Sequence, residues 1–116
     1  MTTTRFYLPL NVPGLAEAVS TGTVVGLAEG FVADDTSEEA EYAALVAAAD
    51  ASAGLLAGLP DGARRRVVVV VEAEDHVGHA PWSQVVAVHA DTADDTDTDE
   101  DLGWFATQEV DDLLAL

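Results

Sequence analysis

The feature that most constrains this chain is a run of five consecutive valines, Val67–Val71. Branching at Cβ restricts valine in a helix and favours extended backbone, so the run predicts a strand, which we place over Arg64–Glu74. Apolar residues that do not alternate with polar ones are typical of a strand buried on both faces. We therefore expect a covering layer on each side of this strand, supplied by the chain itself or by a second subunit.

A long helix is predicted over Ser37–Ala57 and is the first candidate for such a layer. Thr36 and Glu39 stand at the spacing of a capping box, and several acidic residues in the first turn suit the positive end of the helix dipole. The apolar positions follow a helical period, which predicts that Leu45 and Val46 are buried against the sheet.

A shorter helix is predicted from the N-cap Asn11 to about Ser20, with Gly22 ending it. The tail over Asp111–Leu116 is expected to be helical or extended. The remaining strands are predicted over Arg5–Leu10, Val24–Val32, Gln84–Asp91 and Leu102–Glu109. These elements predict one domain over residues 1–116. Its class is α/β, with α+β as an alternative: a two-layer sandwich with a mixed sheet of four to five strands, one long helix and one short helix.

Strand order decides what covers the valines. If the first three strands are laid down in sequence, right-handed crossovers place both helices on one face, and Val68 and Val70 stay open on the other. A homodimer through this sheet face would then cover them. If the first strand lies between the second and third, the helices cover opposite faces and a monomer suffices. We favour the first order, because the short helix is too small to cover a face alone.

The charge balance excludes several classes of partner. The chain has 22 acidic residues, four arginines and no lysine, for a net charge of −18. Nucleic acids and anionic membrane surfaces are bound through clustered basic residues, and only Arg64–Arg66 cluster here. No apolar run approaches the roughly 20 residues of a membrane span, and the first residues lack a secretion-signal pattern. The lack of cysteine excludes thiolate chemistry and fits a cytoplasmic location.

An acidic segment over residues 92–101 is expected to be a solvated loop within the domain. Counted from Asp95, it has acids at positions 1, 3 and 5 of a calcium-binding loop. However, Glu100 stands where that loop needs glycine, and Ala106 stands where it needs glutamate. Loose cation binding by residues 94–101 therefore stays open as a function, without a specific calcium site.

The histidines are the second set of candidate metal ligands. His76 and His79 lie three apart in a predicted loop, and a zinc site would need a third protein ligand, for which His89 is the candidate. Two histidines in a loop are more often surface residues, so we predict no metal and no cofactor.

A polar patch is predicted on one face of the sheet. His89 and Asp91 project from the same side of their strand, about 7 Å apart. The patch forms if the first and last strands present their polar residues to that side, and it would then contain Arg5, Tyr7, His89, Asp91, Thr107 and Glu109. His89, Asp91 and Glu109 would be its catalytic candidates, and Arg5, Tyr7 and Thr107 its ligand contacts. The alternative is a solvated sheet face with cross-strand pairs.

Five segments, taken in order, resemble a small actinobacterial protein family of unknown function. They are Arg5-Phe6-Tyr7-Leu8-Pro9, Glu39-Ala40-Glu41-Tyr42-Ala43-Ala44-Leu45, Arg65-Arg66-Val67-Val68, Val85-Val86-Ala87-Val88-His89-Ala90-Asp91 and Trp104-Phe105-Ala106-Thr107-Gln108-Glu109. The resemblance spans nearly the whole chain. It implies an actinobacterial, cytosolic protein and assigns no catalytic residue.

The function that these observations favour is a non-catalytic accessory or protein-interaction domain, because no nucleophile-elbow or phosphate-loop motif is present. Trp104 and Phe105 are expected to pack in the core, or failing that to anchor an interface. The first alternative is a small enzyme or small-ligand binder that uses the patch around His89 and Asp91. The second is a cation-binding protein that uses the acidic segment.

Overall fold

The five valines begin β3 (Val67–Glu74), the strand second from one edge of a four-stranded sheet. The computed structural model describes residues 3–74 and 77–116, and within them β3 lies between β1 (Thr3–Leu10) and β5 (Val85–Ala90). The short strand β6 (Gly103–Phe105) pairs with the other side of β5. The predicted α/β class is confirmed. All neighbours pair antiparallel, however, where a mixed sheet was expected, because β1 and β3 run in opposite directions although helices separate them in sequence.

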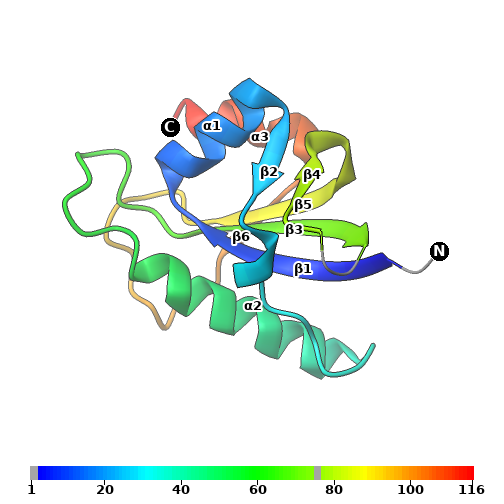
Figure 1. The fold of residues 1–116 in the computed structure, drawn as a ribbon. Helices are drawn as coiled ribbons and strands as arrows, with labels where there is room; N and C mark the ends of the chain where they lie inside the picture. The colour runs from blue at the N-terminus through cyan, green and yellow to red at the C-terminus, as the bar shows by residue number, and fades with distance from the viewer. Residues whose placement is uncertain (1–2, 75–76) are drawn as a thin grey trace.

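Helices cover both faces of this sheet (Figure 1). On one face, α1 (Val12–Thr21) and α3 (Val110–Leu114) pack against Val67, Val69 and Val71. On the other face lies α2 (Glu38–Ala53). No helix in the described ranges has the length and apolar character needed to cross a membrane.

The expectation that Val68 and Val70 would stay open is wrong. Their exposed fractions are 0% and 3%, because alanines of α2 pack directly on them. The helices α1 and α2 lie on opposite faces of the sheet. No open valine face therefore remains to support a homodimer through Val68 and Val70.

The second predicted strand is much shorter than expected. It ends at Val25, because Gly26 adopts a left-handed backbone (φ 79°) and starts a 3₁₀ turn over Leu27–Glu29. The remaining strand, β2 (Thr23–Val25), pairs with β4 (His79–Pro81) in a separate two-stranded sheet. Phe31 then returns to β1, where its backbone exchanges hydrogen bonds of 2.8 and 2.9 Å with Tyr7.

The last predicted strand is also shorter, and the tail is helical. After β6 the chain forms a 3₁₀ turn over Thr107–Glu109 and continues into α3. The Glu109 side chain accepts a hydrogen bond of 2.9 Å from the backbone N–H of Ala106, which holds the turn closed. Thr107 and Glu109 therefore do not lie on a face of the sheet.

The capping residues predicted the ends of α1 correctly and those of α2 only approximately. Asn11 caps α1 by accepting from the N–H of Gly14 at 2.8 Å, and the left-handed Gly22 ends that helix, as predicted. For α2 the cap is Ser37 rather than Thr36, with the Ser37 hydroxyl accepting from the N–H of Ala40 at 3.1 Å. This helix ends at Ala53, four residues earlier than expected.

The face that α2 turns to the sheet consists of small residues: Ala44, Ala48, Ala49 and Ser52. Val46 is 40% exposed, so its predicted burial is wrong, and Leu45 is only half-buried. Small side chains allow close packing, and the fully buried Ser52 hydroxyl reaches both neighbouring strands. It donates to the carbonyl of Leu10 at 2.6 Å and accepts from the N–H of Val67 at 2.8 Å.

Candidate functional site

A buried ion pair lies where β3 begins and β5 ends. The guanidinium of Arg66 donates to both carboxylate oxygens of Asp91, over 2.8 and 2.9 Å, and the backbone N–H of Arg66 donates to the same carboxylate at 3.1 Å. Their exposed fractions are 3% and 5%. Asp91, a predicted catalytic candidate, is thus fully engaged by one arginine, and the hydrogen bond that Arg66 donates to Asp91 is the main cause that raises the pKa of Arg66.

The same arginine also binds the acidic segment. Its guanidinium donates to the backbone carbonyls of Glu100, Asp97 and Thr98, at 2.9, 3.3 and 3.4 Å. Residues 92–101 form a loop with mostly exposed carboxylates. This loop is nevertheless anchored through its backbone, which its composition did not indicate.

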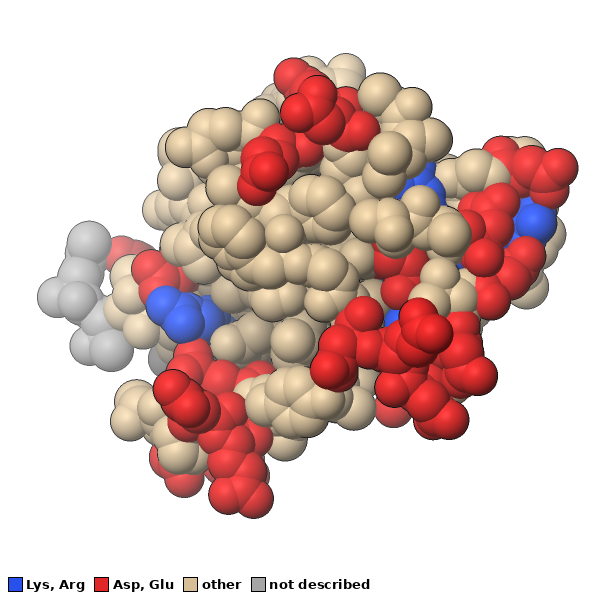
Figure 2. All heavy atoms as spheres, turned by 180° about the vertical axis from the view of Figure 1, so that it is seen from behind, with Lys and Arg blue, Asp and Glu red and all other residues tan. Residues whose placement is uncertain are grey.

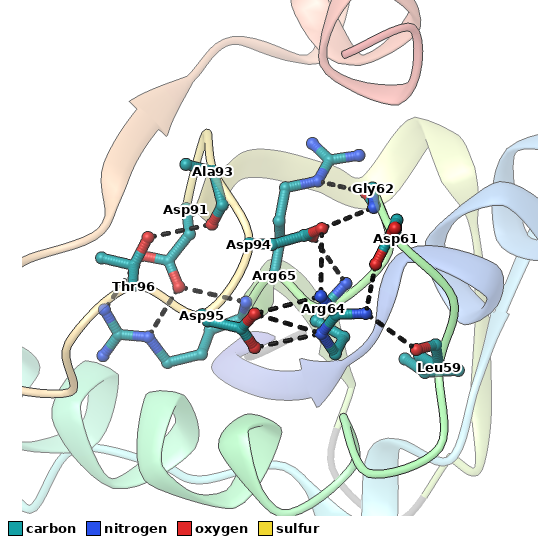
Figure 3. A network of polar contacts seen from close by, with 11 residues as sticks. Leu59, Asp61, Gly62, Arg64, Arg65, Asp91, Ala93, Asp94, Asp95 and Thr96 are labelled. Atoms are coloured by element: carbon teal, nitrogen blue, oxygen red, sulfur yellow. Dashed lines mark hydrogen bonds and ion pairs between the residues drawn. The ribbon is translucent and has the colours of Figure 1, made fainter.

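A second arginine holds the start of this loop (Figure 3). Arg64 donates to Asp95 at 3.1 Å and to Asp61 at 3.0 Å. Asp94 accepts from the backbone N–H groups of Gly62, at 2.6 Å, and Arg64, at 3.0 Å, and the bond from Gly62 is the main cause that lowers the pKa of Asp94.

These contacts leave fewer carboxylate oxygens for a cation. The carboxylates at the start of the acidic segment already accept hydrogen bonds from the protein's own N–H groups. Across residues 3–74 and 77–116, no group of three or more His, Asp or Glu side chains has an arrangement suited to a metal ion.

The main candidate site is a hollow of about 370 Å³ between α2, β6 and the acidic loop, which we call the α2–β6 hollow. It is lined by Tyr42, Leu45, Val46, Ala49, Asp50, Arg66, His89, Thr98, Asp99, Glu100, Asp101, Leu102 and Trp104. The helix supplies one wall and the loop supplies the other. The hydroxyl of Tyr42 donates to Asp101 at 2.8 Å, which ties the two walls together.

Large apolar side chains are exposed in this hollow. Trp104 is 60% exposed and Tyr42 is 54% exposed, so the expectation that Trp104 packs in the core is wrong. Trp104 lies opposite His89 in the register of β5 and β6, and therefore on the face that α2 covers. Its partner Phe105 points the other way and packs against the core on the α1 side.

His89 lies in the hollow beside Trp104, and burial lowers its pKa below 6.5. The neutral imidazole is therefore the dominant form at pH 7. Within residues 3–74 and 77–116, neither ring nitrogen of His89 makes a hydrogen bond.

Arg5 and Tyr7 reach the same face from β1. With Glu41 and His89 they line a neighbouring hollow of about 230 Å³, which we call the β1 hollow. Arg5 donates to Glu41 at 2.9 Å and to Glu72 at 2.9 Å, and the Tyr7 hydroxyl donates to Glu41 at 3.3 Å. The hydrogen bond to Glu72 raises the pKa of Arg5, and burial raises the pKa of Tyr7.

The predicted polar patch is thus assembled only in part. Arg5, Tyr7 and His89 come together, whereas Asp91 is turned into its ion pair with Arg66. The Thr107 hydroxyl is at 3.4 Å from Gln108, and Glu109 closes its own turn. Of the histidines considered for zinc, His79 is exposed on β4 and His76 lies outside the described residues.

Several lining residues of the α2–β6 hollow were not predicted. Asp50 and Val46 are on the outward edge of α2, and their role depends on how that helix is rotated on the sheet. Trp104, by contrast, was named from the sequence as a core residue or an interface anchor, because its side chain is large and aromatic. On the face of the molecule shown in Figure 2, acidic side chains gather in groups and basic side-chain atoms lie among them.

Together these features define a small antiparallel α/β domain with an acidic-walled hollow beside an edge strand. The chain belongs to a family of unknown function, DUF6912, whose match spans residues 4–114. The predicted resemblance to a family of unknown function is confirmed to that extent. No curated protein and no solved structure matches the chain.

Proposed function

We propose that this domain is a non-catalytic interaction module that binds a partner protein through the α2–β6 hollow. The observation that carries the proposal is the exposure of three large side chains around one hollow: Trp104 at 60%, Tyr42 at 54% and Val46 at 40%. Apolar surface left in water costs about 25 cal/mol per Å², so its concentration at one place favours an interface there. Tryptophan and tyrosine are also the residues that most often anchor such interfaces.

The placement of the acidic candidates supports binding over catalysis. General acid–base chemistry needs a titratable group within reach of another or of a substrate. Asp91 is neutralised by Arg66, and Glu109 caps a turn that is separate from the sheet face. His89 is thus left without the carboxylate partners that the catalytic alternative assumed.

A small-ligand binder remains the second candidate, and one observation favours it. Arg5, Tyr7 and His89 line the β1 hollow and supply a cation, a hydroxyl and an imidazole at one place. Arg5 is already paired with Glu41 and Glu72, which reduces what it offers an anionic ligand.

An affinity capture tests the main proposal. The wild-type chain, Trp104→Ala and Val25→Ala are each immobilised and exposed to lysate of the source organism, and retained proteins are identified by mass spectrometry. Val25 is the matched control, because it is 67% exposed on β2 and lines neither the α2–β6 hollow nor the β1 hollow. A partner kept by the wild type and Val25→Ala but lost by Trp104→Ala supports the proposal. Capture that is unchanged in Trp104→Ala contradicts it.

The proposal includes the setting in which the domain acts. We infer an actinobacterial protein of the cytoplasm, based on the family resemblance and on the lack of cysteine. A homodimer, if one forms, has to use a surface other than Val68 and Val70, which are buried under α2. Light scattering at micromolar concentration measures whether the mass exceeds the 12.1 kDa of one chain.

A further inference from the structure

We propose that the α2–β6 hollow receives an arginine side chain from an extended basic segment of the partner protein. This inference rests on the proposed function, and it adds the chemistry that the hollow selects. Three properties support it: the charge of the walls, the aromatic and aliphatic surface between them, and the size of the hollow.

The walls carry negative charge that the protein compensates only in part, through the electrostatic interaction of Asp50 and Glu100 with Arg66. The side chains of Asp50, Asp99 and Glu100 make no hydrogen bond or ion pair with the described residues, although their carboxylates line the hollow. Arg66 is the one basic residue among the lining side chains, and its guanidinium is occupied by Asp91 and by three loop carbonyls. Carboxylates gathered along one hollow make its local potential negative, so the hollow attracts a cation and repels an anion.

The surface between these walls suits the rest of an arginine. Leu45 and Val46 offer apolar contact to the aliphatic stem. The exposed ring of Trp104 offers a face for the planar guanidinium, a contact that is strongest with tryptophan. The neutral imidazole of His89 adds a hydrogen-bond acceptor without adding positive charge.

The size of the hollow is sufficient for one inserted side chain. Its 370 Å³ lies within the range of ligand pockets, which run from about 300 to 1,000 Å³. A partner segment therefore has room to place one long side chain there, while the remainder of the segment rests on the rim. Lysine lacks the planar group that stacks on tryptophan, and we therefore expect arginine to bind more tightly.

A peptide selection tests this inference without a known partner. Random 12-residue peptides displayed on phage are selected on the wild-type chain after depletion on Trp104→Ala. Peptides that survive are expected to contain arginine, and replacing it by citrulline, which keeps the shape and removes the charge, is expected to weaken binding about tenfold or more. Surviving peptides without arginine, or equal affinity for citrulline, overturn the inference and leave the proposed function standing. If every binder is removed by the Trp104→Ala depletion, the proposed function fails with it.

Overall negative charge could by itself retain basic peptides, so a charge-matched pair of variants is needed. The first variant, Asp50→Asn/Asp99→Asn/Glu100→Gln, removes three charges from the hollow. The second, Glu17→Gln/Glu29→Gln/Asp34→Asn, removes three from exposed positions that do not line it. We expect the first to weaken peptide binding about tenfold and the second less than twofold. Equal losses in the two variants would show non-specific attraction and would overturn the inference. Circular dichroism of each variant confirms that it is folded.

Discussion

Arg66 and Asp91 join the start of β3 to the end of β5 through a two-point ion pair that is almost completely buried. The pair closes the end of the sheet at which the acidic loop begins, and the same guanidinium holds that loop by three carbonyls. One side chain therefore links the core of the domain to one wall of the α2–β6 hollow.

Asp91→Asn is expected to lower the free energy of unfolding by about 3 kcal/mol, since breaking a buried ion pair typically costs about 3–5 kcal/mol and asparagine still supplies one acceptor. Urea denaturation followed by circular dichroism measures the loss. The control is Asp112→Asn, an exposed carboxylate on α3. A loss below about 1 kcal/mol would mean that the pair contributes little to stability.

Ala48→Leu is expected to destabilise the domain by about 1–3 kcal/mol, because extra methylenes have no room in a tightly packed contact. Ala48 is 0% exposed and packs on the sheet with Val68. The same substitution at the exposed Ala43 of α2 is the matched control and is expected to change stability by less than about 0.5 kcal/mol. Equal effects at both positions would show that the helix face is wrongly assigned.

The melting temperature is expected to rise as sodium chloride is added. A net charge of −18 on 116 residues repels itself, and salt at 0.1 M screens charges beyond about 10 Å. Scanning calorimetry between low salt and 1 M, with sodium chloride as the only variable, records the trend. A flat or falling curve would remove self-repulsion as a significant cost in this fold.

His89 gives stability a defined dependence on pH. Its pKa in the folded chain lies below the value of about 6.5 in the unfolded chain, because burial disfavours the charged ring. Between those two values the unfolded chain binds more protons, so stability is complete above pH 6.5 and falls as the pH is lowered toward the folded pKa. In His89→Gln the decline between pH 7.5 and 5.5 is expected to be smaller than in the wild type.

Unfolding at several pH values measures this difference. The carboxylates are the same in both proteins, so the comparison isolates the histidine. His79→Gln, at an exposed site, is the control for loss of a histidine as such. An unchanged slope in His89→Gln would show that burial of this ring does not affect folding in that range.

Features set by neighbouring residues could be predicted from the sequence. The five valines predicted β3, and Asn11 and Gly22 predicted the two ends of α1. These predictions succeed because β-branching and capping act over a few neighbouring residues. The rotation of α2 could not be predicted in this way. Its buried face consists mostly of alanines, which give only a weak apolar pattern. The larger Leu45 and Val46 therefore indicated a different face, which the sheet contacts only in part.

The candidate site depends on contacts between distant parts of the chain. Trp104 and His89 become neighbours only through the register of β5 with β6, across the whole acidic loop. The later part of the loop takes its position from backbone carbonyls that bind Arg66. Every residue type carries a carbonyl, so this attachment leaves no mark in the sequence. Strand alternation put Arg5 and Tyr7 on one face of their strand, and the sheet brings that face beside His89, so these three residues line one hollow.

The attachment of the acidic loop to Arg66 has a consequence for how this hollow can diversify. Since carbonyl groups of Asp97, Thr98 and Glu100 accept the hydrogen bonds of this attachment, these bonds do not depend on the side chains of Thr98 and Glu100. Exchanging them leaves the frame in place and alters what the frame displays. One arginine thus separates the backbone shape of the loop from the side chains that the loop displays, so substitutions at these positions change the surface of the hollow without rebuilding the fold.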